Sequence, residues 1–207
     1  MTTLELRTRI PNDTFTAWEL NALLSDYSNQ AAKISSLLKK REIVRIRRGL
    51  YTFTEPLRRE MLSAGALANQ IYSPSYVSED YALSFYGMIP ETPAVVTSVA
   101  MGRSRRFTTE FGVFSYRYCR SRAYPVGVTT AGEGQNRFLI ATPEKALFDK
   151  VSSDRRFDGT DPEAYLLEDL RIDEDALRRL NRQQLKELAP FMTGRLSRLY
   201  DCLEGSR

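Results

Sequence analysis

The side chains of this chain with the clearest chemical potential are cations gathered in one short stretch, residues 28–53. Between Ser28 and Tyr51 the only carboxylate is Glu42, whereas the cations are Lys33, Lys39, Lys40, Arg41, Arg45, Arg47 and Arg48. Lysine and arginine side chains bind phosphate oxygens, and a cluster of them on one element is typical of nucleic-acid contact. Because the net charge of the whole chain is only +4, the indication comes from this clustering and not from total charge.

Other chemistry is limited by composition. The chain has no histidine and only two cysteines, Cys119 and Cys202. This excludes Ser-His-Asp and Cys-His nucleophiles, histidine acid–base catalysis and histidine-ligated zinc. Two isolated cysteines also make a disulfide framework and a structural zinc site unexpected. We therefore expect no metal and no cofactor; an enzyme here would need carboxylates, lysine or tyrosine, with a hard metal ion.

The first half of the basic stretch has helical periodicity. Ser28 is a good N-cap, and one apolar stripe follows it at helical spacing: Ala31, Ile34, Leu37 and Leu38. The opposite face carries short polar and cationic side chains suited to the floor of a groove: Asn29, Lys33, Ser36 and Lys40. This pattern predicts an amphipathic helix over residues 28–40 whose polar face is free to bind.

The second half alternates with a period of two. Val44 and Ile46 are expected to point one way, and Arg45 and Arg47 the other. Gly49 follows Arg48 and supplies the positive φ that a tight hairpin turn needs. The sequence therefore predicts a small basic hairpin directly after the helix.

A further helix is predicted upstream. Thr16 and Glu19 form a T-x-x-E capping box, and Phe15 stands where a hydrophobic staple would begin. Apolar residues expected to line this helix follow: Trp18, Leu20, Leu23 and Leu24. Helix, turn, helix and basic hairpin predict a winged helix-turn-helix.

Asn29, Lys33 and Ser36 would then face the major groove of DNA. Lys40, Arg45, Arg47 and Arg48 would contact the backbone or minor groove. The alternative is a small helical domain whose charges are only solvated.

Beyond the hairpin the pattern changes. Glu55-Pro56 ends the second strand, so we place the boundary between two domains there, 1–55 and 56–207. Helices are expected over residues 57–71, after Ser78 as far as Gly87, and after Thr142-Pro143. Between them, strands are expected at 95–101, 106–108, 113–119, 126–129 and 138–140, and a helical tail follows Asp161. The predicted fold is α+β: an N-terminal winged helix-turn-helix, then a mixed α/β domain with a β-rich centre and a helical tail.

Two pairs of adjacent charged residues are weaker candidates for a chemical role. Glu79-Asp80 begins a helix, where the macrodipole favours acidic residues. Glu144-Lys145 is similar only faintly to the carboxylate and lysine of metal-dependent nucleases, and helix capping explains Glu144. The densest remaining motif is an arginine turn, Arg103, Arg105 and Arg106. It is either a solubilising hairpin tip or a site for an anion or an acidic partner.

Several of these segments together resemble one family, the AbiE-type antitoxins and transcriptional regulators of type IV toxin–antitoxin and phage-defence systems. The resemblance covers roughly residues 15–151, in order, and is carried by LLKKREIVRIRRGLYTF, PSYVSEDYALSFYGMIPE, TSVAMGRSRRFTTEFGVFSYRY and ATPEKALFDKV. A winged helix alone is widespread, whereas the three later motifs in sequence are specific.

The resemblance implies a two-domain, non-enzymatic repressor of its own operon. Its N-terminal domain would bind inverted repeats in double-stranded DNA. Its C-terminal domain, with Arg103, Arg105 and Arg106 as the candidate surface, would counteract a nucleotidyltransferase-like toxin without requiring a stable complex. The sequence has neither a signal peptide nor a span of about 20 apolar residues, so we expect a cytoplasmic protein with no membrane partner. The alternatives are a metal-dependent nuclease with a winged-helix targeting domain and a stand-alone ligand-responsive repressor.

Overall fold

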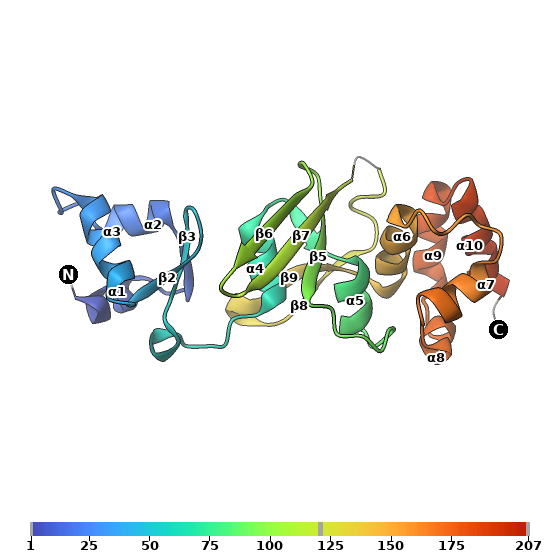
Figure 1. The fold of residues 1–207 in the computed structure, drawn as a ribbon, viewed down its shortest axis with the longest axis horizontal. Helices are drawn as coiled ribbons and strands as arrows, with labels where there is room; N and C mark the ends of the chain where they lie inside the picture. The colour runs from blue at the N-terminus through green and yellow to red at the C-terminus, as the bar shows by residue number, and fades with distance from the viewer. Residues whose placement is uncertain (1, 120–121, 206–207) are drawn as a thin grey trace.

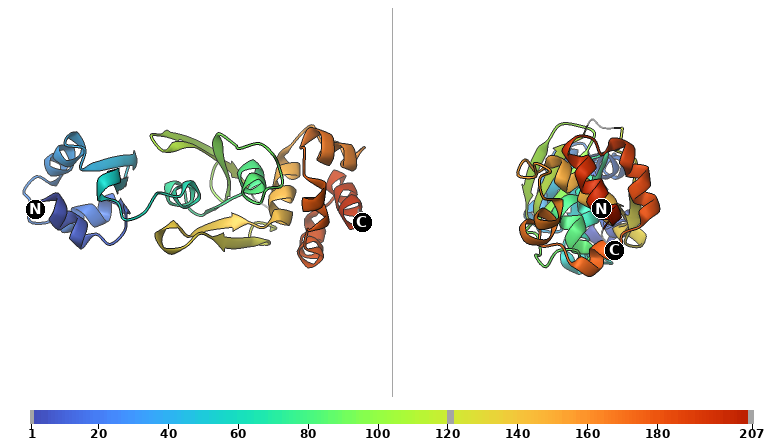
Figure 2. Two further views of the ribbon diagram at one scale, coloured as in Figure 1. Left: turned by 90° about the horizontal axis from the view of Figure 1, so that it is seen from below. Right: turned by 90° about the vertical axis from the view of Figure 1, so that its right-hand side faces the viewer.

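Helices and two β-sheets follow one another along a single long axis in the computed structural model, which describes residues 2–119 and 122–205 (Figure 1). A small sheet with three helices lies at the N-terminal end, a larger mixed sheet occupies the centre, and a bundle of short helices forms the C-terminal end. A view from below repeats this order (Figure 2). The protein is therefore a mixed α+β protein, as the sequence predicts at that level.

Residues 3–53 form what we call the N-terminal unit. Its elements are, in chain order, α1 (Thr3–Arg9), β1 (Thr14–Thr16), α2 (Ala17–Leu23), α3 (Gln30–Lys39), β2 (Ile43–Arg47) and β3 (Leu50–Phe53). The three strands form an antiparallel sheet in the order β1-β3-β2, with Thr16 opposite Leu50. The buried side chains of this unit include Leu6, Phe15, Leu20 and Phe53.

Local signals account for most of these elements. The predicted capping box of Thr16 and Glu19 is present, and Gly49 has the predicted positive φ, +84°. A second T-x-x-E box, Thr2 with Glu5, begins α1, which the sequence reading missed together with the short strand β1. The N-cap of α3 is Asn29 and not the predicted Ser28, since the Asn29 side chain accepts from the amide of Ala32 at 2.9 Å.

Two predictions about the apolar faces are wrong. Ala31 is exposed, so the stripe on α3 that packs inward consists of Ile34, Leu37 and Leu38. Trp18 is exposed as well, although Leu20 and Leu24 are fully buried. Trp18 precedes Leu20 by two residues, which places it on the other side of the helix.

The predicted helix over residues 57–71 is much shorter. A 3-10 turn, η1 (Glu55–Leu57), is followed by an irregular segment, and α4 (Ala64–Ile71) begins only after Ser63, which caps it. The irregular segment uses its amides in tertiary hydrogen bonds: the Asp13 carboxylate accepts from the amides of Arg59 and Glu60. The amide of Ser63 donates to the Asn136 side chain and not to the carbonyl four residues earlier, so tertiary hydrogen bonds replace the predicted helix here.

The central sheet has six strands in the order β6-β7-β5-β4-β9-β8. The strands are β4 (Ser75–Val77), β5 (Val95–Ala100), β6 (Arg105–Thr109), β7 (Gly112–Tyr118), β8 (Val128–Ala131) and β9 (Phe138–Ala141), with the 3-10 turn η2 (Gly134–Asn136) before β9. The pairs β4–β9 and β5–β7 are parallel and the other three are antiparallel. All five predicted strands of this region are present with slightly shifted bounds, whereas β4 was missed.

Helices cover both faces of this sheet. On one face the Tyr116 hydroxyl donates to the Ala68 carbonyl of α4. On the other face lie α5 (Glu79–Phe85) and α6 (Pro143–Ser153). The Tyr76 hydroxyl reaches Asp149 of α6 from β4, and Arg117 reaches Glu79 of α5 from β7. Thr142 caps α6 with Pro143 in its first turn, as predicted.

The tail is more broken than predicted. It contains α7 (Pro162–Ala164), a π-helical turn η3 (Tyr165–Asp169), α8 (Glu174–Arg178), α9 (Arg182–Leu188), the 3-10 turn η4 (Ala189–Phe191) and α10 (Arg195–Gly205). Two separate helices lie between Asp173 and Leu188, because the Asn181 side chain accepts from the amides of Gln183 and Gln184 and caps a new helix that begins at Arg182.

The buried apolar side chains form two clusters. One lies within the N-terminal unit, and the other joins α4, the central sheet and the tail. The predicted boundary at residue 55 falls between them along the chain, but Ile46 and Leu50 of the hairpin belong to the second cluster. We call residues 64–205 the C-terminal unit. Within residues 2–119 and 122–205, no helix combines the length and the apolar character that a membrane span requires.

Candidate nucleic-acid interface

The predicted groove-facing residues share one side of α3. Asn29, Lys33, Ser36 and Lys40 are separated by four, three and four positions, which is the spacing of one helix face. Asn29 is exposed and uses its side-chain oxygen for the cap, which leaves its amide nitrogen as the donor for a ligand. Lys33 is half-buried, with its ammonium 5.4 Å from the centre of the Tyr27 ring. Lys40 is exposed directly after the helix.

The hairpin departs from simple alternation. Arg45 stands opposite Tyr51 and Arg47 stands opposite Leu50, so Ile46 is an extra, bulged residue. Ile46 and Leu50 are only 3% and 5% exposed and pack with the C-terminal unit. Tyr51 and Leu50 are adjacent on β3, so their side chains point to opposite faces of the sheet. The predicted common orientation of Arg45 and Arg47, which stand opposite them, is therefore wrong.

The same bulge separates the hairpin arginines. Arg45 is exposed, and its guanidinium lies 5.9 Å from the centre of the Tyr51 ring. Arg47 is half-buried and donates through Nη1 to the carbonyl of Arg48, 3.0 Å away. Its charge also reaches the C-terminal unit: burial raises the pKa of the Tyr116 hydroxyl, and Arg47 opposes that rise. Arg48, in contrast, is exposed.

Four of the predicted cations, Lys40 and the three hairpin arginines, have no carboxylate partner in the part of the chain that the structure describes. No ion pair involves Lys40, Arg45, Arg47 or Arg48 within residues 2–119 and 122–205. Lys40 and the hairpin arginines are therefore not neutralised by these parts of the fold. Exposed, unpaired cations on adjacent elements form a surface that attracts phosphate groups.

The arginines of the second predicted surface do not form one compact group. Arg103, Arg105 and Arg106 are all exposed, at the start of the edge strand β6. Arg105 stands opposite Tyr116 and Arg106 opposite Ser115. Because successive side chains of a strand point to opposite faces, Arg105 and Arg106 leave the sheet in opposite directions. A partner on one face would meet only part of this set.

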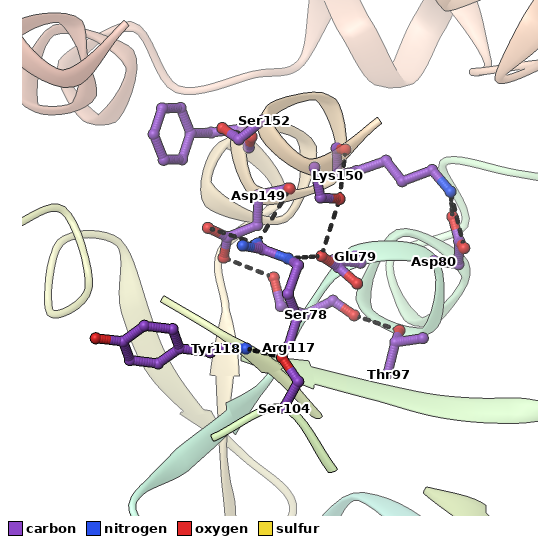
Figure 3. A network of polar contacts seen from close by, with 12 residues as sticks. Ser78, Glu79, Asp80, Thr97, Ser104, Arg117, Tyr118, Asp149, Lys150 and Ser152 are labelled. Atoms are coloured by element: carbon purple, nitrogen blue, oxygen red, sulfur yellow. Dashed lines mark hydrogen bonds and ion pairs between the residues drawn. The ribbon is translucent and has the colours of Figure 1, made fainter. Parts of the chain in front are cut away.

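A buried polar network in the C-terminal unit was not predicted (Figure 3). Lys145 is fully buried, and its Nζ lies 3.0 Å from Oδ1 of the buried Asp149. The other carboxylate oxygen of Asp149 accepts from the hydroxyls of Tyr76 and Ser78, at 2.9 and 2.8 Å. Lysine and aspartate four residues apart on a helix are the signal that was available in the sequence.

Arg117 extends this network to α5. Figure 3 shows it between Asp149 and Glu79, with Nε donating to the Glu79 carboxylate and Nη2 donating to the Asp149 carbonyl. Burial raises the pKa of Glu79, and the Arg117 charge draws it back part of the way. Glu144, which we expected to act as a cap, instead accepts from the amide of Asn181 and ties the tail to α6. Each buried charge here has a partner within the fold.

The acidic residues of the nuclease alternative are thus engaged by neighbours. Glu79 accepts from Arg117 and Ser153, and Glu144 accepts from Asn181. Among residues 2–119 and 122–205 there is no group of three or more histidine, cysteine, aspartate or glutamate side chains placed to hold a metal ion. Neither the models of known protein families nor the curated proteins give a match to this chain.

Proposed function

We propose that the N-terminal unit is a winged helix-turn-helix that binds double-stranded DNA. The element order helix, strand, helix, helix, strand, strand supports this, as does the sheet order β1-β3-β2, which places the β2–β3 hairpin beside α3. The observation that carries the proposal is the set of exposed cations without an ion pair among the described residues, Lys40 at the end of α3 with Arg45 and Arg48 on the hairpin. α3 enters the major groove, with Asn29, Lys33 and Ser36 facing the bases.

The exposed cations around α3 make the contacts with DNA phosphates in this proposal. Lys40, Arg45 and Arg48 are the exposed members of the predicted set and can reach the DNA backbone. Arg47 is turned toward the C-terminal unit, so we assign it the role of holding the hairpin in place. Phosphate contacts supply affinity without reading sequence, whereas contacts to base edges supply specificity.

We further propose that the protein is a cytoplasmic, non-enzymatic antitoxin that represses its own operon at inverted repeats. The resemblance of its later motifs to the AbiE-type antitoxins supports this role. The C-terminal unit counteracts a nucleotidyltransferase-like toxin without a requirement for a stable complex, and Arg103, Arg105 and Arg106 are its candidate surface. Their exposure on an edge strand leaves them accessible to such a partner.

The DNA-binding proposal is tested with a labelled duplex that carries the region upstream of the protein's own gene. Binding is measured by fluorescence anisotropy over a series of salt concentrations. Arg45→Ala with Arg48→Ala should weaken binding to every sequence and reduce the slope of log affinity against log salt by about 1.8, since each phosphate contact contributes about 0.9. An unchanged affinity with an unchanged slope removes the hairpin from the interface.

A matched control comes from α8. Arg178→Ala with Arg179→Ala removes the same charge from exposed arginines that have carboxylate partners in the fold. This pair should leave both affinity and slope unchanged. Base reading is tested with Lys33→Ala and with Asn29→Ser, because serine keeps the helix cap. Each should relax the preference at one or two positions by about 1–3 kcal/mol.

The antitoxin proposal predicts a gene for a nucleotidyltransferase-like toxin beside this one, and it is tested in cells that express that toxin. The full-length chain should restore growth, and Arg103→Glu with Arg105→Glu should impair rescue while repression stays intact. Loss of repression with unimpaired rescue would place these arginines on DNA instead.

The nuclease alternative is tested by incubating the purified protein with plasmid and Mg²⁺ or Mn²⁺. We expect no cleavage; cleavage abolished by Glu144→Gln or Glu79→Gln would favour the nuclease alternative.

A further inference from the structure

The only tryptophan of the chain stands on the surface of the N-terminal unit. Trp18 is 78% exposed, although tryptophan is on average one of the more buried residue types. Its helix, α2, buries Leu20 completely, and Leu24 directly after the helix is also fully buried. Packing within the fold therefore does not explain the indole at this position.

The backbone holds Trp18 beside the hairpin turn. Thr16 pairs with Leu50 in the sheet, and the amide of Ala17 donates to the carbonyl of Gly49 at 2.9 Å. The capping box of Thr16 and Glu19 then fixes the direction in which α2 begins. Trp18 is thus one residue away from a direct hydrogen bond to the turn between β2 and β3.

An exposed cation lies at the turn beside this position, and the nearby carboxylate caps a helix. Arg48 is exposed at the turn and has no ion pair among the described residues, whereas Arg47 is turned inward. The nearest carboxylate in sequence, Glu19, is engaged: its Oε2 accepts from both the amide and the hydroxyl of Thr16, each at 2.7 Å. The backbone thus places two exposed side chains near the turn, the Arg48 guanidinium and the Trp18 indole.

A DNA backbone matches this combination. Its phosphates are ligands for arginine, and its deoxyribose rings offer apolar edges against which an indole can lose its contact with water. A lipid surface would require more than one exposed apolar side chain next to the cation.

We propose that Trp18 and Arg48 together contact the sugar–phosphate backbone of the DNA bound by α3. This inference rests on the proposed DNA-binding function and adds to it a residue that the sequence pattern had assigned to the core. The contact increases affinity for all sequences alike, because neither side chain reads a base edge.

The single tryptophan provides a direct test. Full-length protein is titrated with the unlabelled upstream duplex while its tryptophan emission is recorded, and anisotropy of the labelled duplex is recorded in parallel. We expect the emission to change and to saturate at the same DNA concentration as the anisotropy. If the anisotropy reports binding and the emission stays constant, the inference is wrong and the DNA-binding function survives.

Variants separate the two side chains. Trp18→Ala should weaken binding about tenfold for every sequence, as expected for one aromatic contact to nucleic acid, with the salt slope unchanged. Trp18→Phe should keep most of the affinity, and Arg48→Ala should reduce the slope by about one. Because the indole is exposed, these variants should unfold at the wild-type urea concentration, which excludes misfolding as the cause of weaker binding.

The matched control is Leu4→Ala on α1, which removes another exposed apolar side chain of the same unit, 72% exposed. It should not affect affinity or emission. Equal losses for Leu4→Ala and Trp18→Ala, or no loss for Trp18→Ala, would overturn the inference. If the full-length protein binds no duplex at all, the proposed function fails together with it. An emission change with vesicles of anionic phospholipid but not with DNA would overturn the inference and identify a membrane as the occupant.

Discussion

The cationic surface of the N-terminal unit and the buried network around Asp149 in the C-terminal unit differ in how their charges are balanced. In the N-terminal unit, Lys40, Arg45 and Arg48 are exposed and have no ion pair among the described residues. In the C-terminal unit, Lys145 and Asp149 are buried and paired with each other. Both regions contain ionisable side chains, so residue type alone does not distinguish an exposed interface from a buried network. Burial and partners do.

This difference separates the expected consequences of mutation. A buried charge that loses its partner costs stability, because the remaining charge stays in a poorly solvating environment. An exposed charge without a partner costs the fold almost nothing when it is removed, so its loss should be seen only when a ligand binds. The residues whose mutation lowers stability should therefore hardly overlap with the residues whose mutation lowers DNA affinity.

The largest effect is expected at Lys145. Lys145→Met keeps the volume of the side chain but leaves Asp149 buried without its ammonium, which should lower the free energy of unfolding by about 3–5 kcal/mol. Urea unfolding measures this. The control is Lys150→Met on the same helix, whose partner Asp80 is more exposed, with a side chain 39% accessible. A loss for Lys145→Met no larger than the loss for Lys150→Met would contradict the distinction between buried and exposed pairs.

A second variant tests the same pair from the other side. Asp149→Asn keeps an acceptor for the hydroxyls of Tyr76 and Ser78 but removes the negative charge beside Lys145. It should also destabilise the protein. Combining it with Lys145→Met should cost less than the sum of the two single changes, because no unpaired charge remains in the double variant.

Features encoded by a few neighbouring residues were predictable from the sequence. The capping box at Thr16, the positive φ of Gly49 and the Thr142-Pro143 start of α6 were all found as expected. Each depends on side chains within three or four positions of one another. The same kind of signal was present at Thr2 and Glu5 but was not used, and α1 was missed.

Features that depend on distant residues were not predictable. The helix expected from residue 57 is absent as far as Ser63, where distant residues hold the chain: Asp13 binds the amides of Arg59 and Glu60, and Asn136 binds the amide of Ser63. The bulge at Ile46 places Arg45 and Arg47 opposite adjacent residues of β3, which period-two alternation cannot indicate. The same holds for the candidate site. The sequence identifies the cations, but only the fold shows that Arg47 points inward and Arg48 outward.

A moderate, pH-dependent effect is expected at Asp154. Hydrogen bonds from Arg156, a donor hydroxyl from Tyr165 and the Arg156 charge hold the pKa of this carboxyl well below its usual range. A lowered folded-state pKa means that the ionised group stabilises the protein above the unfolded pKa of about 3.9, and that this stability is lost as the pH falls through the folded value. Asp154→Asn should therefore be less stable than wild type at pH 7.

The measurement compares urea midpoints of Asp154→Asn and wild type from neutral to acid pH. We expect a difference of about 1 kcal/mol at neutral pH, since Arg156 is largely exposed and solvent screens the pair. The difference should shrink in acid as the wild-type carboxyl takes up a proton. A difference that does not vary with pH would mean that the substituted amide is worse only in its packing, and that the charge of Asp154 contributes nothing.

The smallest effect is expected at Arg178, which sharpens the comparison between the units. The Arg178 side chain is 57% exposed, so DNA could reach it, but it has two carboxylate partners, Glu174 and Asp175, each 2.9 Å away. Exposed pairs contribute only about 0–0.5 kcal/mol on a helix, so Arg178→Ala should leave the urea midpoint within error of wild type. It should also leave DNA affinity unchanged, because the two carboxylates offset the attraction of the guanidinium for a phosphate.

Arg48→Ala is the matching variant of the hairpin. It should also leave the urea midpoint unchanged, but it should lower DNA affinity. If both variants lowered affinity equally, exposure alone would decide which arginines meet DNA. The absence of a carboxylate partner would then lose its value as the sign of an interface.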